Sequence, residues 1–371
     1  GARRLPPRPA VNEAPPLGAP GHARLQAFVL GSALALMGGW VLHVGKGVFV
    51  PVVLAALVAF VIVGVTRLLA KIPGVGPALP LKLRYALAVL LAAGALAFVA
   101  VIALANLDRV AARAPQYQAT LLATIQQLAV RFGVEDEPTW GTLRQIFLEQ
   151  VSLQALIGSS VAVAASIAGG VIVVLLYVAF LLLEQRAFAA KVDRIAGGPA
   201  NAARVRQLFD SINARVGSYL ALKTFLGFLQ GVLSFGLMWL YGLEFAAFWA
   251  MLMVLFNYVP YIGSFLAVAL PVAMAIVQFG DFGIVLTLLA GLFVVQFVIG
   301  NFLDPYLLGN SLNLSPFVIL VSLTVWSGLW GVSGAFLAVP VTAVMAIVFS
   351  EFAATRPIAV LLSRNGRLSD E

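Results

Sequence analysis

Long uncharged stretches dominate the chain from residue 25 onward. They lie at 25–45, 47–66, 85–105, 155–183, 224–243, 245–280, 282–303 and 305–350. About twenty helical residues cross the hydrocarbon core of a bilayer. The stretches are rich in Leu and Ala and show no alternation of polar and apolar positions. They therefore predict an all-α, polytopic membrane protein of about eight helical segments rather than a barrel of strands.

The composition supports this class and argues against several others. The 371 residues are 62% hydrophobic and 10% charged, whereas soluble domains carry about 25% charged residues. The chain has no Cys and only two His, so no disulfide framework, thiol nucleophile or zinc site is expected. No phosphate-binding loop and no catalytic pair within a span is found, so we predict neither an enzyme, nor a cofactor, nor a bound metal. The net charge of +8 reflects basic residues at the ends of spans, and no nucleic-acid partner is expected.

The charges between spans predict an orientation. The segments 67–84 and 184–223 carry a clear excess of Lys and Arg, whereas 107–154 carries more acidic than basic residues. The positive-inside rule then places the first two segments and both termini in the cytoplasm, and 107–154 outside. We expect a multi-pass protein of a bacterial inner membrane.

The same reading divides the chain into segments. They are a disordered basic tail (1–22), three transmembrane helices (23–106), an extracytoplasmic helical segment (107–154), a transmembrane helix (155–183), a cytoplasmic amphipathic segment (184–223), a transmembrane transport region (224–350) and a cytoplasmic tail (351–371). Apolar residues in 201–222 recur at helical spacing, which predicts an amphipathic helix leading into the next span. In the external segment, Pro138 is expected to open a second helix.

Two uncharged stretches, 245–280 and 315–350, are too long for one crossing. A straight helix of either length would measure about 54 Å, against a hydrocarbon core of about 30 Å. Helix-breaking residues stand near the middle of both, at Pro260 and Gly263 in the first and at Gly328, Gly331 and Gly334 in the second. We therefore predict two broken helical hairpins. Four short, tilted spans are the alternative.

Polar side chains gather around these breaks. Interrupted helices mark the binding sites of many transporters, because their unpaired backbone groups must face protein or water. The candidate residues of a solute pathway are Asn257, Tyr258, Pro260, Tyr261 and Gly263 at the first break, Ser327, Trp330, Gly331 and Ser333 at the second, and Gln296, Asn301 and Asp304 between them.

Each candidate also has a purely structural interpretation. Pro260 and Gly263 could only bend a helix, and the tyrosines could anchor a hairpin at a membrane interface. The amides could join helices; Gln296 and Asn301, about 140° apart around a helix, do not share a face. Asp304 is costly inside a membrane unless it is paired or hydrated, which favours a function, but it could also lie at the cytoplasmic interface.

Two further features are expected to be structural. Lys223 opens a span on the cytoplasmic side, where its amine is expected to extend to the interface. Gly227 and Gly231 form a GxxxG pattern, which predicts a close contact between helices.

Three motifs resemble the autoinducer-2 exporter (AI-2E) family of bacterial membrane proteins. They are NYVPYIGSFLAVALP, QFVIGNFLDPYLLGNSLNLSP and WSGLWGVSGAFLAVPVTAV, with a weaker fourth in GSYLALKTFLGFLQG. The resemblance covers about 25–362 and is weakest in 107–154. It implies a homopentamer that exports autoinducer-2 or performs sodium/proton antiport, and the last motif is nearer to the exporter branch. Several relatives carry an acid where this chain has Val298 and Ile299, which puts cation coupling at that point in doubt.

Three functions remain open. The first is export of a small polar solute, autoinducer-2 or a similar hydroxylated metabolite, by a homo-oligomer in the lipid bilayer. The second is Na⁺/H⁺ antiport, which needs a titratable carboxylate, and only Asp304 qualifies. The third is a membrane scaffold without transport.

Overall fold

The computed structural model describes residues 20–72, 79–131, 153–309 and 312–366. These residues form twelve α-helices and one short π-helix, and no β-strand is found among them. The chain divides into two units, 1–47 and 48–371. The first contains α1 (Pro20–Val44), and most of the predicted tail lies outside the described residues. The prediction of an all-α polytopic protein is confirmed.

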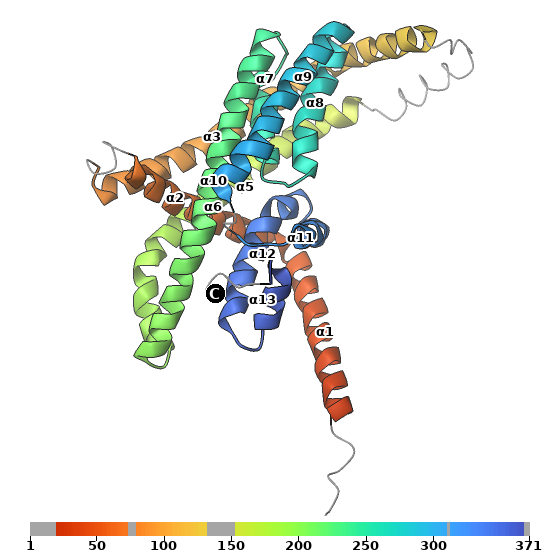
Figure 1. Cartoon of the computed structure of the whole chain (residues 1–371). Coiled ribbons are helices and arrows are strands. Elements are labelled where there is room, and N and C mark those ends of the chain that lie inside the picture. Colours follow the sequence, from red (N-terminus) through yellow and green to blue (C-terminus); the bar gives the residue numbers. More distant parts are fainter. Residues whose placement is uncertain (1–19, 73–78, 132–152, 310–311, 367–371) are drawn as a thin grey trace, which may run out of the picture. The chain divides into compact units, whose positions relative to one another are not determined.

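The second unit contains the remaining helices, apart from the first two residues of α2 (Figure 1). They are α2 (Lys46–Lys71), α3 (Leu81–Arg131), α5 (Leu153–Ile195), α6 (Pro199–Leu240), α7 (Ala246–Phe256), α8 (Ile262–Phe279), α9 (Phe282–Val298), the π-helix η1 (Ile299–Leu303), α10 (Asp304–Leu308), α11 (Pro316–Trp330), α12 (Val332–Glu351) and α13 (Arg356–Leu362).

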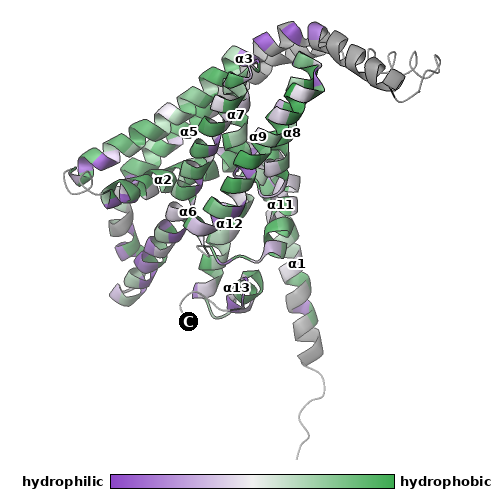
Figure 2. Cartoon of the chain, turned by 45° about the horizontal axis from the view of Figure 1, so that its top comes forward, coloured by the Kyte–Doolittle hydropathy of each residue, from purple (hydrophilic) through white to green (hydrophobic). Residues whose placement is uncertain are grey.

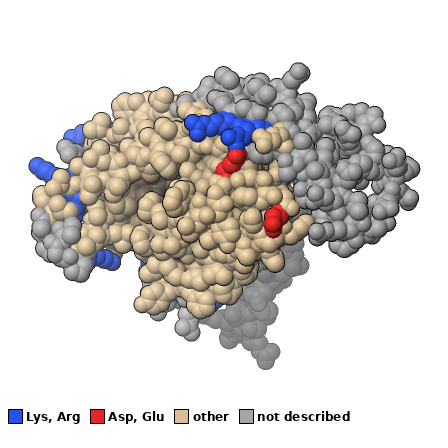
Figure 3. Space-filling view, turned by 90° about the horizontal axis from the view of Figure 1, so that it is seen from above, with Lys and Arg blue, Asp and Glu red and all other residues tan. Residues whose placement is uncertain are grey.

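Among the described residues, six helices are long and apolar enough to cross a membrane. They are Lys46–Lys71, Leu81–Asn106, Pro199–Leu240, Ile262–Phe279, Phe282–Leu308 and Val332–Glu351. Figure 2 shows hydrophobic residues along these helices and hydrophilic residues where α5 ends and α6 begins. Seen from above in Figure 3, the described surface carries few Lys, Arg, Asp or Glu side chains. Such a surface suits lipid contact.

Three expected segment boundaries do not coincide with helix ends. α3 continues through residue 107, α5 through residue 184, and α6 through residue 223. Charged residues mark where a chain leaves lipid, but they do not end a helix; that requires Gly, Pro or a capping residue. The junction of α5 and α6 is an example, because Gly197 and Gly198 lie between the two helices and Pro199 is the first residue of α6. The helix expected from Pro138 lies outside the described residues.

α6 forms the axis of the second unit and packs into two different cores. Its C-terminal half packs against α7 and α9, in a core that also includes residues of α8 and contains the fully buried Met238, Met253 and Leu288. Its N-terminal half packs against α12, and its buried Val216 lies in a core that also receives Leu57 of α2. A third core joins α2, α3 and α5. Figure 1 shows α6 running the length of this arrangement.

α2 and α6 cross with almost no space between their backbones. A Cβ atom added to Gly64 of α2 would lie 2.3 Å from the carbonyl oxygen of Gly217 in α6. A Cβ on Gly217 would lie 3.1 Å from the carbonyl oxygen of Phe60. Small residues that let helices approach closely are typical of membrane helix interfaces. Gly227 and Gly231 play the same role against α7, where a Cβ on Gly231 would meet Val254 at 2.5 Å, so the expected GxxxG contact is confirmed.

We expect Gly64→Ala to lower the free energy of unfolding by about 2–3 kcal/mol, because the new methyl group would collide with backbone rather than with a movable side chain. Gly236→Ala on α6 is the matched control, since nothing lies within 4 Å of its added Cβ. Thermal unfolding of both variants in detergent checks the difference. Equal melting temperatures for the two variants would contradict the close crossing.

The two predicted hairpins are present. α7 and α8 form the first, and α11 and α12 form the second (Figure 1). α7 has 11 residues and α11 has 15, which correspond to about 16 Å and 22 Å. Both first arms are short against a hydrocarbon core of about 30 Å, which favours hairpins over pairs of full spans.

Candidate functional site

The first break occupies residues 257–261 and contains a strained turn. The amide of Ile262 donates to the carbonyl of Pro260 at 2.7 Å, and Tyr261 between them has φ 61° and ψ −65°. These values define a classic γ-turn, a rare conformation for a residue with a side chain. Gly263 follows, where a Cβ would lie 1.9 Å from the carbonyl oxygen of Phe256. Pro260 and Gly263 therefore fix the fold of this turn.

The second break is a single residue. Gly331 has φ 64° and ψ −140°, a conformation that is open only to glycine. Three residues later, a Cβ on Gly334 would lie 1.8 Å from the carbonyl oxygen of Trp326. The indole of Trp326 donates to Thr342 at 3.3 Å, and its ring centroid lies 4.9 Å from that of the buried Trp330. Gly334 and Trp326 thus bring the two arms into close contact.

The first break packs against the second hairpin. Val259, which is buried, lies in one cluster with Leu323 of α11 and Ala338 of α12. Its neighbour Tyr258 packs on the core that contains Val339 of α12. The two interrupted segments therefore meet, although a long stretch of sequence separates them.

Three amides form a connected cluster at the first break. Asn257 donates through Nδ2 to Oε1 of Gln230 at 2.9 Å. Gln230 in turn donates through Nε2 to Oε1 of Gln296 at 2.5 Å. Gln230 is completely buried in the middle of α6, and Asn257 is 9% exposed. The amide cluster, Asn257–Gln230–Gln296, thus joins the broken hairpin, α6 and α9.

A second polar group lies two turns before Gln230 on α6. The amine of Lys223 lies 2.6 Å from Oδ2 of Asp304, and the two side chains are 11% and 21% exposed. The hydroxyl of the next residue, Thr224, lies 2.5 Å from that of Tyr258. Because seven residues make nearly two full turns, Lys223 and Gln230 share a face of α6, about 10 Å apart along its axis.

A π-helix places Asp304 in this pair. η1 ends where the amide of Asp304 donates to the carbonyl of Ile299, five residues back rather than four. Pro305 follows; its ring crowds the carbonyl four residues earlier and it has no amide hydrogen to donate. The wider π turn accommodates this proline and rotates Asp304 toward α6. π-turns inside helices are frequent at functional sites.

The structure brings together four of the twelve predicted pathway residues. Asn257, Tyr258, Gln296 and Asp304 all bond to α6. Asn301 is exposed and donates to the carbonyl of Phe297, four residues earlier. Tyr261 is also exposed.

At the second break, the predicted residues serve the hairpin itself. Ser327 donates to the carbonyl of Leu323 in its own helix. Trp330 is buried against Trp326, and Ser333 is half-buried on the first turn of α12.

Sequence reasoning missed the α6 side of the site. Gln230 and Thr224 were not among the predicted residues, and Lys223 was expected to extend to the interface rather than to pair with Asp304. A usable signal was present, because Lys223, Gly227, Gln230 and Ser234 recur at intervals of three and four residues. A polar or small stripe along one face of an otherwise apolar helix indicates a buried polar contact.

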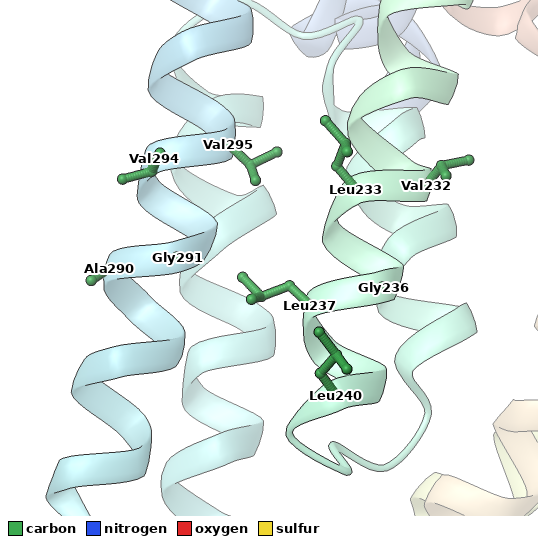
Figure 4. A pocket seen from close by; sticks show the side chains of 9 residues that line it. All are labelled: Val232, Leu233, Gly236, Leu237, Leu240, Ala290, Gly291, Val294 and Val295. Carbon is green, nitrogen blue, oxygen red and sulfur yellow. The ribbon is translucent and has the colours of Figure 1, made fainter.

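An apolar groove lies further along the same helices and is distinct from the polar groups. Its volume is about 580 Å³, and it is lined by Val232, Leu233, Gly236, Leu237, Leu240, Ala290, Gly291, Val294 and Val295 (Figure 4). It lies between α6 and α9 and offers only hydrocarbon side chains, so it does not suit a polar solute.

The chain is similar to known transport proteins. A putative transport protein of Borreliella burgdorferi is 34% identical over 200 residues, which are 54% of this chain and 55% of that protein. The AI-2 transport protein TqsA of Escherichia coli is 30% identical over 255 residues, 67% of this chain and 71% of TqsA. The chain thus spans about half the length of the Borreliella protein.

The model of the AI-2E family transporters matches residues 30–354, which include all helices of the site and both hairpins. The interrupted hairpins and the polar face of α6 lie within this match, and so do the three motifs that carry the resemblance. The chain therefore belongs to the AI-2E transporter family.

Proposed function

We propose that the protein transports a small, uncharged polar solute out of the cell across a bacterial inner membrane, and that the amide cluster binds this solute. The observation that carries the proposal is the buried chain of bonds from Asn257 through Gln230 to Gln296. It connects an interrupted helix to two spanning helices, which is the arrangement in which transporters hold their solutes.

The chemistry of the cluster favours a hydroxylated, neutral solute. Amides offer both donors and acceptors but no charge. A solute hydroxyl can replace each amide–amide bond by an equivalent one, so the cluster can open without leaving buried polar groups unpaired. Autoinducer-2 has this chemistry, and TqsA is named as a transporter of it. Autoinducer-2 or a similar hydroxylated metabolite is therefore the proposed substrate.

Sodium/proton antiport fits the site less well. Hard cations need several oxygen ligands, and no group of three acidic or histidine side chains is found among the described residues. The one candidate carboxylate, Asp304, already faces the amine of Lys223, which occupies the position that a metal cation would take.

Gln230→Leu is expected to lower autoinducer-2 efflux from reconstituted vesicles at least tenfold. The substitution keeps the volume of the side chain but leaves Asn257 and Gln296 without their shared partner. Thr324→Val on α11 is the control, since its exposed hydroxyl bonds only to its own helix. Efflux of autoinducer-2 from wild-type vesicles that equals efflux from protein-free vesicles would overturn the proposal and favour a scaffold.

The proposed assembly is a homo-oligomer. Support comes from the family resemblance and from apolar side chains that are more than half exposed, such as Phe228 and Trp239 on α6 and Phe293 on α9. Contiguous apolar surface in a membrane protein is covered by lipid or by another subunit.

A further inference from the structure

We propose that Asp304 and Lys223 form a proton-coupling site, in which a proton competes with the amine of Lys223 for the carboxylate and thereby drives the conformational change of transport. The inference rests on the proposed function and adds its driving ion. Its starting point is an ion pair that the amide cluster does not require.

In the part of the chain that the structure describes, the carboxylate of Asp304 has one paired oxygen and one unpaired oxygen. Oδ2 of Asp304 accepts from Lys223 at 2.6 Å, whereas Oδ1 is buried and has no hydrogen-bond partner among the described residues. A structural carboxylate buried in a membrane protein is normally satisfied on both oxygens. A free, buried carboxylate oxygen is a position where a proton can bind.

The surroundings of Asp304 suit a proton better than a metal cation. The titratable groups near Asp304 are the amine of Lys223, which pairs with it, and the phenol of Tyr219, which lies within electrostatic range. α9 and η1 contribute no titratable side chain. A metal cation would have to displace Lys223 and would still find one carboxylate, whereas a proton needs only one lone pair.

Proton binding at Asp304 breaks its ion pair with Lys223. The proton adds to a carboxylate oxygen and gives a neutral acid, so the charge-assisted bond to Lys223 is lost. Lys223 then remains as an ammonium on a residue that is 8% exposed, where an unpaired charge is unstable. Its long aliphatic stem allows the amine to move toward water. The protonated site therefore favours a different conformation from the one described.

The first break connects the ion pair to the amide cluster. Tyr258 bonds to Thr224, the residue after Lys223, and the preceding Asn257 bonds to Gln230. A movement of Lys223 and its helix face thus changes both contacts of the first break. Proton binding at Asp304 and solute binding at the amide cluster act on the same turn, which is the condition for coupling two sites.

The test is efflux of autoinducer-2 from vesicles that contain the wild-type protein, with and without a pH gradient that is acidic outside. The gradient is expected to accelerate wild-type efflux at least threefold. In Asp304→Asn, efflux without the gradient should persist. The ratio of efflux with the gradient to efflux without it should fall to about one. Glu184→Gln is the matched control, because Glu184 forms an exposed ion pair with Lys191, and it should keep the full acceleration.

The outcomes separate this inference from the proposed function. Acceleration that survives in Asp304→Asn, or is missing in the wild type, would overturn proton coupling while leaving solute transport intact. Should Asp304→Asn fail to fold, Lys223→Met/Asp304→Leu removes both charges and should also transport without acceleration.

A measurement without solute tests proton binding at Asp304 even if no efflux is found at all. Infrared difference spectra between alkaline and acidic buffer should show a protonated buried carboxyl band in the wild type. The band should be absent in Asp304→Asn and present in Glu184→Gln. If no band of the wild-type spectrum is lost in Asp304→Asn, Asp304 is not a proton site.

Discussion

Replacing Lys223 by methionine alone is expected to lower the free energy of unfolding by about 3–5 kcal/mol, because it leaves Asp304 as an uncompensated charge in a largely buried position. The pair is suited to such an effect, since its side chains are only 11% and 21% exposed. Methionine keeps the length and the apolar stem of lysine, so lost packing contributes little. Unfolding in detergent by heat or by added denaturing surfactant measures the change.

Two further variants isolate the charge. Lys223→Met/Asp304→Leu, which removes both charges, is expected to regain most of the lost stability, because apolar side chains often replace a buried ion pair without cost. Lys191→Met breaks an ion pair with side chains that are 59% and 54% exposed, and it should change stability by less than about 1 kcal/mol. If Lys223→Met lowered the free energy of unfolding no more than Lys191→Met does, the pair of Lys223 and Asp304 would be better hydrated than the structure indicates.

The fold could be predicted largely because lipid imposes simple rules. The length of each uncharged stretch sets the number of crossings, and the two over-long stretches had to break near Pro260 and Gly331. What hydropathy does not report is where a helix ends in water. α3 continues to Arg131 and α6 begins at Pro199, since a helix ends where its backbone bonds end and not where the membrane ends.

The site could be predicted only on the side of the breaks. Asn257 and Tyr258 lie close to the helix breaker Pro260, so their position in the sequence identifies them as candidates. Lys223 and its partner Asp304 are 81 residues apart, and local sequence holds no sign that they meet. Gln230 lies in the middle of a regular helix, where a single amide in an apolar span is as consistent with a helix contact as with a binding group.

The π-helix explains why the position of Asp304 opposite Lys223 could not be predicted from the sequence. A regular α-helix from Phe282 through Leu308 would advance Asp304 by 100° for every residue after Gln296, and a wide turn at Ile299–Leu303 changes that angle. The proline that enforces the turn, Pro305, comes after the carboxylate that it reorients. Sequence periodicity assumes a constant angle per residue, so it could not place Asp304 opposite Lys223.

Gly334→Ala is expected to produce the largest loss among the glycine variants, about 3 kcal/mol or more. Its Cβ would lie 1.8 Å from the carbonyl oxygen and 2.5 Å from the carbonyl carbon of Trp326. Both are backbone atoms of α11, so no side-chain rotation relieves the collision and the arms of the second hairpin must separate. Because Val259 of the first break packs on this hairpin, solute efflux should fall together with the melting temperature.

Gly328→Ala, in the same motif, makes this prediction specific. Gly328 lies within α11, and nothing is found within 4 Å of its added Cβ. Alanine there should leave stability unchanged or raise it by up to about 1 kcal/mol, because alanine favours a helix more than glycine does. A Gly334→Ala protein as stable as Gly328→Ala would mean that the two arms do not touch at Trp326. The arms of the second hairpin would then be held by their other contacts, which include the bond from Trp326 to Thr342 of α12 and the packing of Leu323 with Ala338.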